Sequence, residues 1–327
     1  MNYTNPVYPH SAPDPFALQH HGEYWCYFTG LQPDGRAFGI LHSPDLIHWR
    51  YAGSALDRLP PGVIPYPDTC YWAPEVTVLD GRFYLYYSVG NEENMQIRVA
   101  VAEQPGGPFV DSGHRLTQET FAIDAHVFRD DDGSAYLFYA TDYFDHPRVG
   151  TGTAFDRLLD LFTLAGRPRP VTRARFDWQI YDPQRASKGN VCWHTLEGPF
   201  VLKRQGLYYQ MFSGGNWQNA SYGLGYGVTD SLEREGEWDQ PCDGVNQMPV
   251  LRSRPELGVI GPGHNSVVRS PDGQSWVCVY HRWQPETHER VLAIDLLDWE
   301  EDRLVVYGPT NTASSLASRP LVSSESG

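Results

Sequence analysis

An aromatic strand that recurs five times constrains the fold of this chain more than any other feature. Each copy is a short run of Tyr, Trp, Phe and β-branched residues, and four of the five end in a small residue. The five copies are residues 24–30, 83–90, 135–141, 207–214 and 276–281. Their first residues lie 59, 52, 72 and 69 positions apart. A spacing this regular predicts one structural unit repeated five times along the chain.

Each aromatic strand belongs to a larger unit. A turn precedes it, such as Asp80-Gly81 or Asp272-Gly273, and a second apolar strand comes before that turn, which together indicate a hairpin. A third strand follows most copies, as in residues 97–102. Five repeats of several strands favour an all-β fold, a five-bladed β-propeller forming a single domain. A β-sandwich is the alternative, but it does not require five similar hairpins at such spacing.

The propeller uses nearly the whole chain. We expect it to span residues 1–311 and to be followed by a small, polar C-terminal tail at 312–327. Residues 166–192, rich in Arg and Pro, form a long connection between the third and fourth blades, a pattern shared by functional loops and inert excursions.

The net charge of −15 argues against several partners, because an acidic body repels phosphate backbones and anionic lipid. We therefore expect no nucleic acid partner. No apolar run approaches the length of a membrane span, so we expect no membrane partner either. The N-terminus lacks the basic and apolar regions of a signal peptide, and the five Cys lack paired spacing. These features predict a cytoplasmic protein with reduced cysteines. The sequence does not indicate an oligomeric state.

The residues in front of the aromatic strands are titratable in all five repeats. Counting back eight to twelve positions gives Asp14, Glu75, Asp124, Glu197 and His264. The first strand of each propeller blade lines the central channel, so equivalent positions at its start meet on one face. A single Asp before Pro is usually a turn residue, but five equivalent titratable positions predict a site. Clustered acids raise one another's pKa, and a pair of carboxylates can act as acid and base on a glycosidic bond.

At these positions the sequence resembles glycoside hydrolase family 43. The resemblance covers residues 5–311 and rests on motifs in all five repeats, namely Asn5-Pro6 with Ala12-Pro13-Asp14-Pro15, Tyr71-Trp72-Ala73-Pro74-Glu75-Val76, Ile123-Asp124-Ala125-His126-Val127-Phe128, Glu197-Gly198-Pro199, Gly263-His264 and Leu297-Asp298-Trp299 with the earlier Arg290. Ala125 is a small departure, because relatives often have Pro there. The family has a five-bladed propeller and removes arabinose or xylose units from plant polysaccharides with inversion.

The resemblance implies a role for each acid. Asp14 would be the general base that activates water, and Glu197 the general acid that protonates the leaving oxygen. Asp124 would hold the pKa of that acid up and orient it. In an inverting enzyme the carboxyls of Asp14 and Glu197 are expected to lie roughly 6.5 to 9.5 Å apart, which leaves room for water.

The remaining site residues have alternatives. His264 resembles the family's axial histidine, which often faces a calcium ion or a water in the channel, or it is a hydrogen-bonded core histidine. A structural calcium is therefore possible, and no cofactor is required. Trp72 and Trp193 are candidate sugar platforms or plain core residues. Arg290 matches an arginine that reaches the sugar pocket, or it is one more arginine of an outer strand. Glu75 is grouped with the substrate-binding residues.

The substrate predicted from these features is an arabinose- or xylose-containing oligosaccharide. The chain ends soon after the fifth repeat, whereas family β-xylosidases commonly carry an extra β-sandwich. This favours an exo-acting α-L-arabinofuranosidase, with a β-xylosidase and an endo-1,5-α-L-arabinanase as alternatives. A retaining relative acting on fructose fits poorly, because its Asn-Asp-Pro and Arg-Asp-Pro motifs are absent. A carbohydrate-binding propeller without catalysis would tolerate loss of the three acids, yet all three are present.

Overall fold

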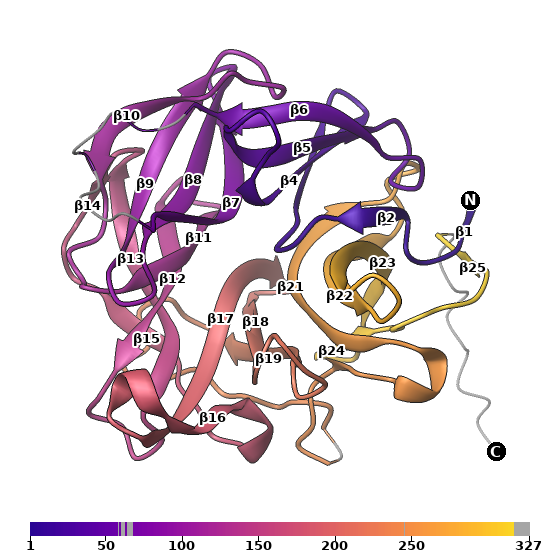
Figure 1. The fold of residues 1–327 in the computed structure, drawn as a ribbon. Coiled ribbons are helices and arrows are strands. Elements are labelled where there is room, and N and C mark those ends of the chain that lie inside the picture. Colours follow the sequence, from indigo (N-terminus) through magenta and orange to yellow (C-terminus); the bar gives the residue numbers. More distant parts are fainter. Residues whose placement is uncertain (58, 60–62, 64–67, 245, 317–327) are drawn as a thin grey trace.

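The chain folds into five β-blades arranged around a central axis, as a computed structural model shows (Figure 1). Parallel pairing of one strand from each joins the third and fourth blades into a single ten-stranded sheet. The structure describes residues 1–57, 59, 63, 68–244 and 246–316. Within these residues the helices are three single turns of 3-10 helix, η1 (Asp177–Gln179), η2 (Ala186–Lys188) and η3 (Pro255–Leu257). The predicted all-β, five-bladed propeller is confirmed.

Each blade is a meander of antiparallel strands. Blade 1 contains β3 (Phe16–His20), β4 (Glu23–Leu31), β5 (Ala37–Ser43) and β6 (Arg50–Leu56). Blade 2 contains β7 (Cys70–Leu79), β8 (Arg82–Gly90), β9 (Met95–Ala102) and β10 (Val110–Arg115). Blade 3 contains β11 (Ala122–Arg129), β12 (Ala135–Tyr143), β13 (Gly150–Asp160), β14 (Thr163–Leu164) and β15 (Arg169–Thr172). Blade 4 contains β17 (Val191–Arg204), β18 (Leu207–Gly214), β19 (Gly223–Thr229) and β20 (Leu251–Arg252), with β16 (Ile180–Arg185) beside β17. Blade 5 contains β21 (Ile260–Arg269), β22 (Trp276–Gln284), β23 (Glu289–Glu300) and β24 (Arg303–Val306).

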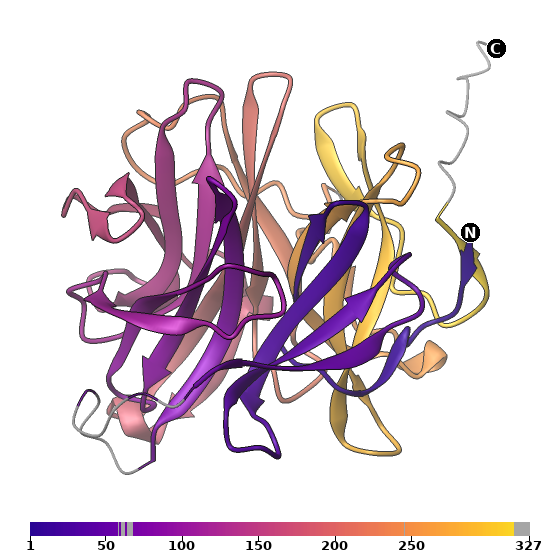
Figure 2. The same cartoon turned by 90° about the horizontal axis from the view of Figure 1, so that it is seen from above.

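The N-terminus closes the ring by joining the last blade. Strand β2 (Tyr8–Ser11) pairs with β23 of blade 5, so the N-terminal segment lies beside the last blade (Figure 2). A further pair, β1 (Asn2–Tyr3) with β25 (Ser314–Ser315), lies outside the ring. Leu316 is buried in the core between blades 5 and 1. The prediction of a tail at 312–327 is therefore wrong for residues 314–316, which pack on the fold. Residues 317–327 lie outside the described residues.

The hydrophobic core is divided into layers between neighbouring blades, which explains the aromatic repeats. Side chains alternate along a strand, and β8 shows the consequence. Phe83, Leu85 and Tyr87 pack toward blade 1, whereas Tyr84 and Tyr86 pack toward blade 3. A middle strand buried on both faces needs a continuous apolar run rather than an alternating one.

Tyrosine suits these layers because its hydroxyl can bond to the next blade while its ring is buried. Tyr27 of blade 1 donates to the carbonyl of Pro105 at 2.7 Å, and Tyr86 of blade 2 donates to the carbonyl of Leu161 at 2.9 Å. These bonds join adjacent blades at the edges of their shared cores.

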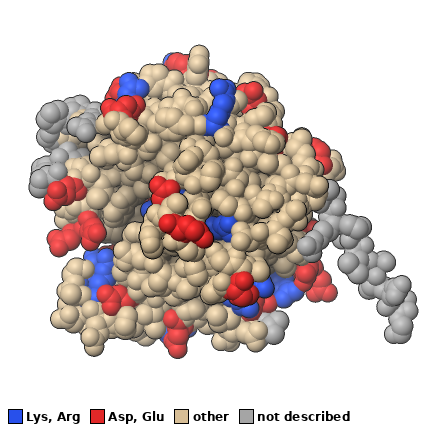
Figure 3. Space-filling view, turned by 45° about the vertical axis from the view of Figure 1, so that its right-hand side comes forward, with Lys and Arg blue, Asp and Glu red and all other residues tan. Residues whose placement is uncertain are grey.

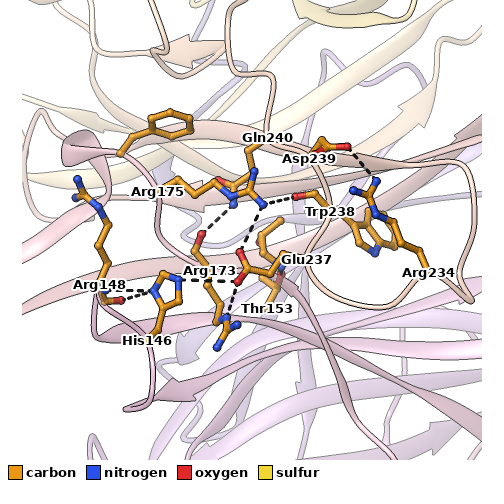
Figure 4. Close-up of polar contacts among 12 residues, drawn as sticks. His146, Arg148, Thr153, Arg173, Arg175, Arg234, Glu237, Trp238, Asp239 and Gln240 are labelled. Carbon is orange, nitrogen blue, oxygen red and sulfur yellow. Dashed lines mark hydrogen bonds and ion pairs between the residues drawn. The ribbon is translucent and has the colours of Figure 1, made fainter.

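The connection at residues 166–192 is structured rather than a plain loop. It supplies β15 as an outer strand of blade 3 and β16 as a partner of β17. Glu237 of blade 4 lies beside it and contacts three side chains, with nitrogens of Arg173, Arg175 and His146 at 2.8, 3.6 and 3.9 Å (Figure 4). This cluster ties the connection and the end of blade 3 to blade 4.

Charged side chains are scattered over the surface. The face in Figure 3 shows acidic and basic groups interspersed on a largely uncharged surface, without a concentrated basic patch. No helix of the described residues is long and apolar enough to cross a membrane.

Candidate active site

On or just before the inner strand of every blade, one residue at an equivalent position lies in the left-handed backbone region. The five equivalent residues are Asp14, Ala73, Asp124, Gly198 and His264, with φ between 46° and 60°. Gly261 of β21 is a further such residue in blade 5. In blades 2 to 5 the ladder to the next strand shifts register around that residue, as a β-bulge does. A positive φ is costly for residues other than Gly and is found where the surrounding structure enforces it, often at functional sites.

Four of these five residues donate their backbone N–H to a side chain of the preceding blade. The N–H of Ala73 donates to Thr29, that of Asp124 to Ser88 and that of His264 to Ser213, at 2.8, 2.9 and 2.6 Å. The N–H of Asp14 donates to Nδ1 of His281 at 3.1 Å. Each acceptor lies on the second strand of its blade. We call these four bonds the inter-blade latches.

In blade 4 the residue at the equivalent position, Gly198, forms its hydrogen bond with one of the candidate catalytic acids instead. The N–H of Gly198 donates to Oδ2 of Asp124 at 2.9 Å. Because Gly198 directly follows Glu197, Asp124 fixes the backbone that carries the neighbouring acid.

The three acids converge on one cavity of about 240 Å³ at the mouth of the channel. Asp14, Asp124 and Glu197 come from three different blades and all line it. The predicted site residues Trp72, His264 and Arg290 line the same cavity. The structure thus brings together residues that are up to 276 positions apart in the chain.

Asp14 is held in its ionised form. Burial alone would raise the pKa of this carboxyl, but the guanidinium of Arg290 at 2.8 Å and the nearby rings of His264 and His281 lower it well below the usual range. Burial lowers the pKa of His281 to about 4, so this histidine is neutral and accepts the Asp14 N–H at Nδ1.

Glu197 has the opposite character. Burial raises the pKa of its carboxyl to about 7, and the negative charge of Asp14 adds to this effect. The hydroxyl of Tyr222, which donates to Oε1 at 2.6 Å, and the guanidinium groups of Arg290 and Arg185 oppose it. A carboxyl with such a pKa can carry a proton near neutral pH and release it to a bound substrate.

The pKa of Asp124 is also raised, well above its usual range, by burial first and then by the charges of Glu197 and Asp14. The raised pKa of Glu197 comes chiefly from burial, so the structure favours an orienting role for Asp124 over the predicted role of holding that pKa up.

The cavity thus contains one ionised carboxyl, Asp14, and one that can carry a proton, Glu197. The model of glycosyl hydrolases family 43 matches residues 3–305. The chain belongs to glycosyl hydrolase family 43. The predicted family membership is thus confirmed, and the protein is a glycoside hydrolase.

Individual family 43 proteins are similar at low identity. A β-D-galactofuranosidase of Aspergillus niger is 30% identical over 85% of this chain and 76% of that protein. An extracellular exo-α-(1→5)-L-arabinofuranosidase of Streptomyces avermitilis is 26% identical over 86% of this chain. This chain spans only 56% of that second protein. The crystal structure of a thermostable family-43 glycoside hydrolase has a TM-score of 0.81 and 31% identity, over 96% of this chain and 98% of the other.

One predicted substrate-binding residue of this family 43 protein lies away from the sugar cavity. Glu75 stands two residues beyond Ala73, the residue at the bulge, and so one step deeper in the channel. It is paired with His126, which packs on Phe200 with ring centroids 4.5 Å apart. The bulge in β7 brings Ala73, not Glu75, to the position of Asp14, and Glu75 lines a smaller hollow next to the acids. Its contact with substrate stays a prediction.

The prediction for Trp193 is wrong. Its side chain is fully buried at the start of β17 and does not line the cavity. Arg185 and Lys188 stack on its ring at 5.2 and 5.1 Å. This part of β17 pairs with β13 and β16 before the strand reaches Glu197, so its side chains belong to the core between those strands.

Sequence reasoning missed several residues of the site. Tyr181 and Arg185 line the cavity from the connection at 166–192. The composition of this connection does not distinguish a functional loop from an inert excursion. Trp217 lines it from the loop after β18, and Tyr222 lies behind Glu197. The Arg-rich composition of the connection was the one signal available, whereas nothing local marked Trp217 or Tyr222.

The prediction of a structural calcium depends on His264. Among the residues that the structure describes, no group of three or more His, Cys, Asp or Glu side chains is arranged to hold a metal ion. Among the described residues, the carboxylate within 4 Å of His264 is Asp14 at 3.4 Å, which is already paired with Arg290. Calcium prefers six to eight oxygen ligands, so the side chains present do not form such a site, and no catalytic step is derived from a metal.

Proposed function

We propose that this family 43 protein is an inverting, exo-acting α-L-arabinofuranosidase. The observation that supports the proposal best is the contrast between two buried carboxyls in one cavity. Arg290 keeps the pKa of Asp14 low, while burial raises the pKa of Glu197 to about 7. General base and general acid need this difference at the same pH.

The reaction follows from these two protonation states. Ionised Asp14 removes a proton from a water molecule, whose oxygen attacks the anomeric carbon. Protonated Glu197 gives its proton to the glycosidic oxygen as the bond from that oxygen to the anomeric carbon breaks. The products are the free sugar, inverted at the anomeric carbon, and the shortened oligosaccharide. After the reaction Asp14 is protonated and Glu197 is ionised. Asp14 then gives a proton to solvent and Glu197 takes one up before the next turnover.

Two observations support removal of a terminal pentose. The cavity, at about 240 Å³, suits one small sugar rather than the interior of a long chain. An exo-α-(1→5)-L-arabinofuranosidase is among the similar proteins. Trp72 gives the cavity an apolar wall, and Arg290 holds the base while lining the same space.

The test is a panel of chromogenic arabinofuranosides and xylosides, with time-resolved NMR of the released anomer. We expect arabinose from α-L-arabinofuranosides, released first as the inverted anomer. Release of the retained anomer would contradict the inverting mechanism, and a preference for xylosides would favour a β-xylosidase. Internal fragments from linear arabinan would favour an endo-arabinanase.

A matched pair of variants separates catalysis from carbohydrate binding. Glu197→Gln should abolish hydrolysis while oligosaccharide binding persists, and the exposed Glu256→Gln should retain full activity. An active Glu197→Gln protein would remove the assigned acid. A wild type that binds oligosaccharides without hydrolysing any would favour the non-catalytic alternative.

A β-D-galactofuranosidase is a second candidate, because a protein of that name is 30% identical to this chain. The ring of β-D-galactofuranose has the same configuration as that of α-L-arabinofuranose and bears a longer exocyclic chain. A chromogenic β-D-galactofuranoside in the same panel distinguishes the two activities by their kcat/KM.

A further inference from the structure

Two tryptophans form a shelf beside the catalytic cavity. Trp217, in the loop after β18, and Trp283, at the end of β22, lie nearly parallel at 13°, with ring centroids 6.0 Å apart. The indole N–H of Trp283 donates to the backbone carbonyl of Trp217 at 2.6 Å, which fixes the two segments together. Both side chains are half-buried, so part of each ring is available to a ligand.

The shelf borders a second hollow that continues from the first. This hollow is lined by Trp217, Gln218, Ile260, Trp283, Pro285 and His288, among others, and Trp217 and Gln218 line the catalytic cavity too. The two hollows therefore adjoin at Trp217 and Gln218, and Trp283 lines only the second one.

The chemistry of the hollow suits a neutral, hydroxylated ligand. Among the residues that the structure describes, its lining contains no Asp, Glu, Lys or Arg, and it combines apolar faces with the amides of Gln218 and Gln284. Aromatic surface with a few polar groups is typical of pockets that bind uncharged small molecules. A sugar ring offers a face of C–H groups to an indole and hydroxyls to the amides.

The loop that lines the hollow also adjoins the general acid. The loop that carries Trp217 ends at Tyr222, whose hydroxyl bonds Glu197 at 2.6 Å. Because the general acid protonates the glycosidic oxygen, the sugar attached to that oxygen extends past the acid.

We propose that the shelf of Trp217 and Trp283 binds the sugar unit on the leaving-group side of the bond that is cleaved. The inference rests on the proposed glycosidase function and deepens it: the substrate class is an oligosaccharide whose second unit stacks on the shelf, whichever terminal sugar the cavity accepts. Trp217 also lies under Arg290, 4.5 Å from its guanidinium, so Trp283 is the residue to change without touching the catalytic pair.

The experiment compares two substrates of one sugar, a methyl furanoside that leaves the shelf empty and an arabinotriose that covers it. For Trp283→Ala we expect about a tenfold rise in KM for the triose and less than a twofold change in kcat/KM for the methyl glycoside. Trp283→Phe, which keeps a ring face, should restore most of the affinity. The control is Trp276→Ala, because Trp276 lies on the same strand at its opposite end and packs against Trp299.

The outcomes separate this inference from the proposed function. Equal losses on both substrates, or no loss on either, would overturn the shelf while leaving the hydrolase intact. A wild type that prefers xylosides or galactofuranosides would contradict the arabinofuranosidase proposal. In that case the Trp283 variants are measured on the methyl glycoside and the trisaccharide of the preferred sugar. A loss confined to the trisaccharide would support the shelf, and equal losses or no loss would overturn it.

Discussion

Tyr222 donates its hydroxyl hydrogen to Oε1 of Glu197 at 2.6 Å, from the end of the loop before β19, 25 residues after the acid. A hydrogen bond to a carboxylate stabilises the ionised form and lowers the pKa. Tyr222 therefore opposes the effect of burial and helps to keep the pKa of Glu197 near 7 rather than higher. The same bond fixes the direction in which the acid points.

Tyr222→Phe should shift the alkaline limb of the pH profile upward. Without the hydroxyl, the pKa of Glu197 rises, so the acid stays protonated to higher pH. Activity at the optimum should fall about tenfold, since a hydrogen bond to a charged group is lost. The measurement is kcat/KM as a function of pH. An alkaline limb that stays in place or moves down would show that Tyr222 does not act on this proton.

Arg290→Gln should move the opposite limb. The charge of Arg290 lowers the pKa of Asp14, whereas burial raises it. Removing the charge raises this pKa, so the base is protonated at pH values where the wild type is active. We expect the acidic limb to rise by about 1 to 3 pH units.

The control for this variant is Arg282→Gln on the same blade, because Arg282 bonds Asn311 and not Asp14. It should leave both limbs where they are. An Arg290→Gln protein with an unchanged acidic limb would refute the assignment of Asp14 as the base that titrates there.

The overall fold was predictable because its cause is local. A middle strand that packs on two neighbours must be apolar on both faces, and the aromatic run of residues 83–90 displays this directly in the sequence. The positions of Asp14 and Asp124 were predictable for a related reason, since counting back from those strands finds the same place in two blades.

The same counting failed at Glu75, because a bulge at Ala73 changes which residue faces the cavity and leaves no signature in composition. Trp193 was a candidate because it lies close before Glu197, and nearness in sequence does not reveal that the strand changes partners between the two residues. Tyr222 and Trp217 act through contacts between distant segments, which one sequence does not display.

Ser88→Ala tests the inter-blade latch that holds Asp124. The change leaves the buried N–H of Asp124 without its acceptor, which should cost about 1 to 3 kcal/mol of unfolding free energy. The left-handed backbone that aims Asp124 and supports Gly198 would relax, so kcat should fall while KM changes little. Thermal unfolding and steady-state kinetics measure the two effects.

The matched control for the latch is Ser270→Ala. The hydroxyl of Ser270 is also buried and accepts a backbone N–H, from Ser275, but it lies in the turn at the other end of blade 5. It should lower stability without lowering kcat. Equal loss of kcat in both variants would mean that Ser88 contributes stability alone.

The raised pKa of Glu197 implies that the wild type gives up stability for catalysis. A carboxyl whose pKa is about 7 when folded and 4.5 as its ordinary value binds its proton more tightly in the folded state. Its contribution is therefore fully favourable below pH 4.5 and is lost as the pH rises through 7. Above that pH the folded protein must hold a buried charge.

Glu197→Gln should consequently stabilise the protein in a pH-dependent way. Glutamine is neutral at every pH, so the variant should match the wild type near pH 4, where Glu197 is protonated. At pH 8 it should be more stable by an amount on the order of 2 kcal/mol, seen as a rise of a few degrees in Tm. Glu256→Gln, on the exposed surface, provides the control and should show no such rise. If Glu197→Gln is equally stable relative to the wild type at both pH values, the carboxyl ionises normally in the folded protein and cannot be the proton donor near neutral pH.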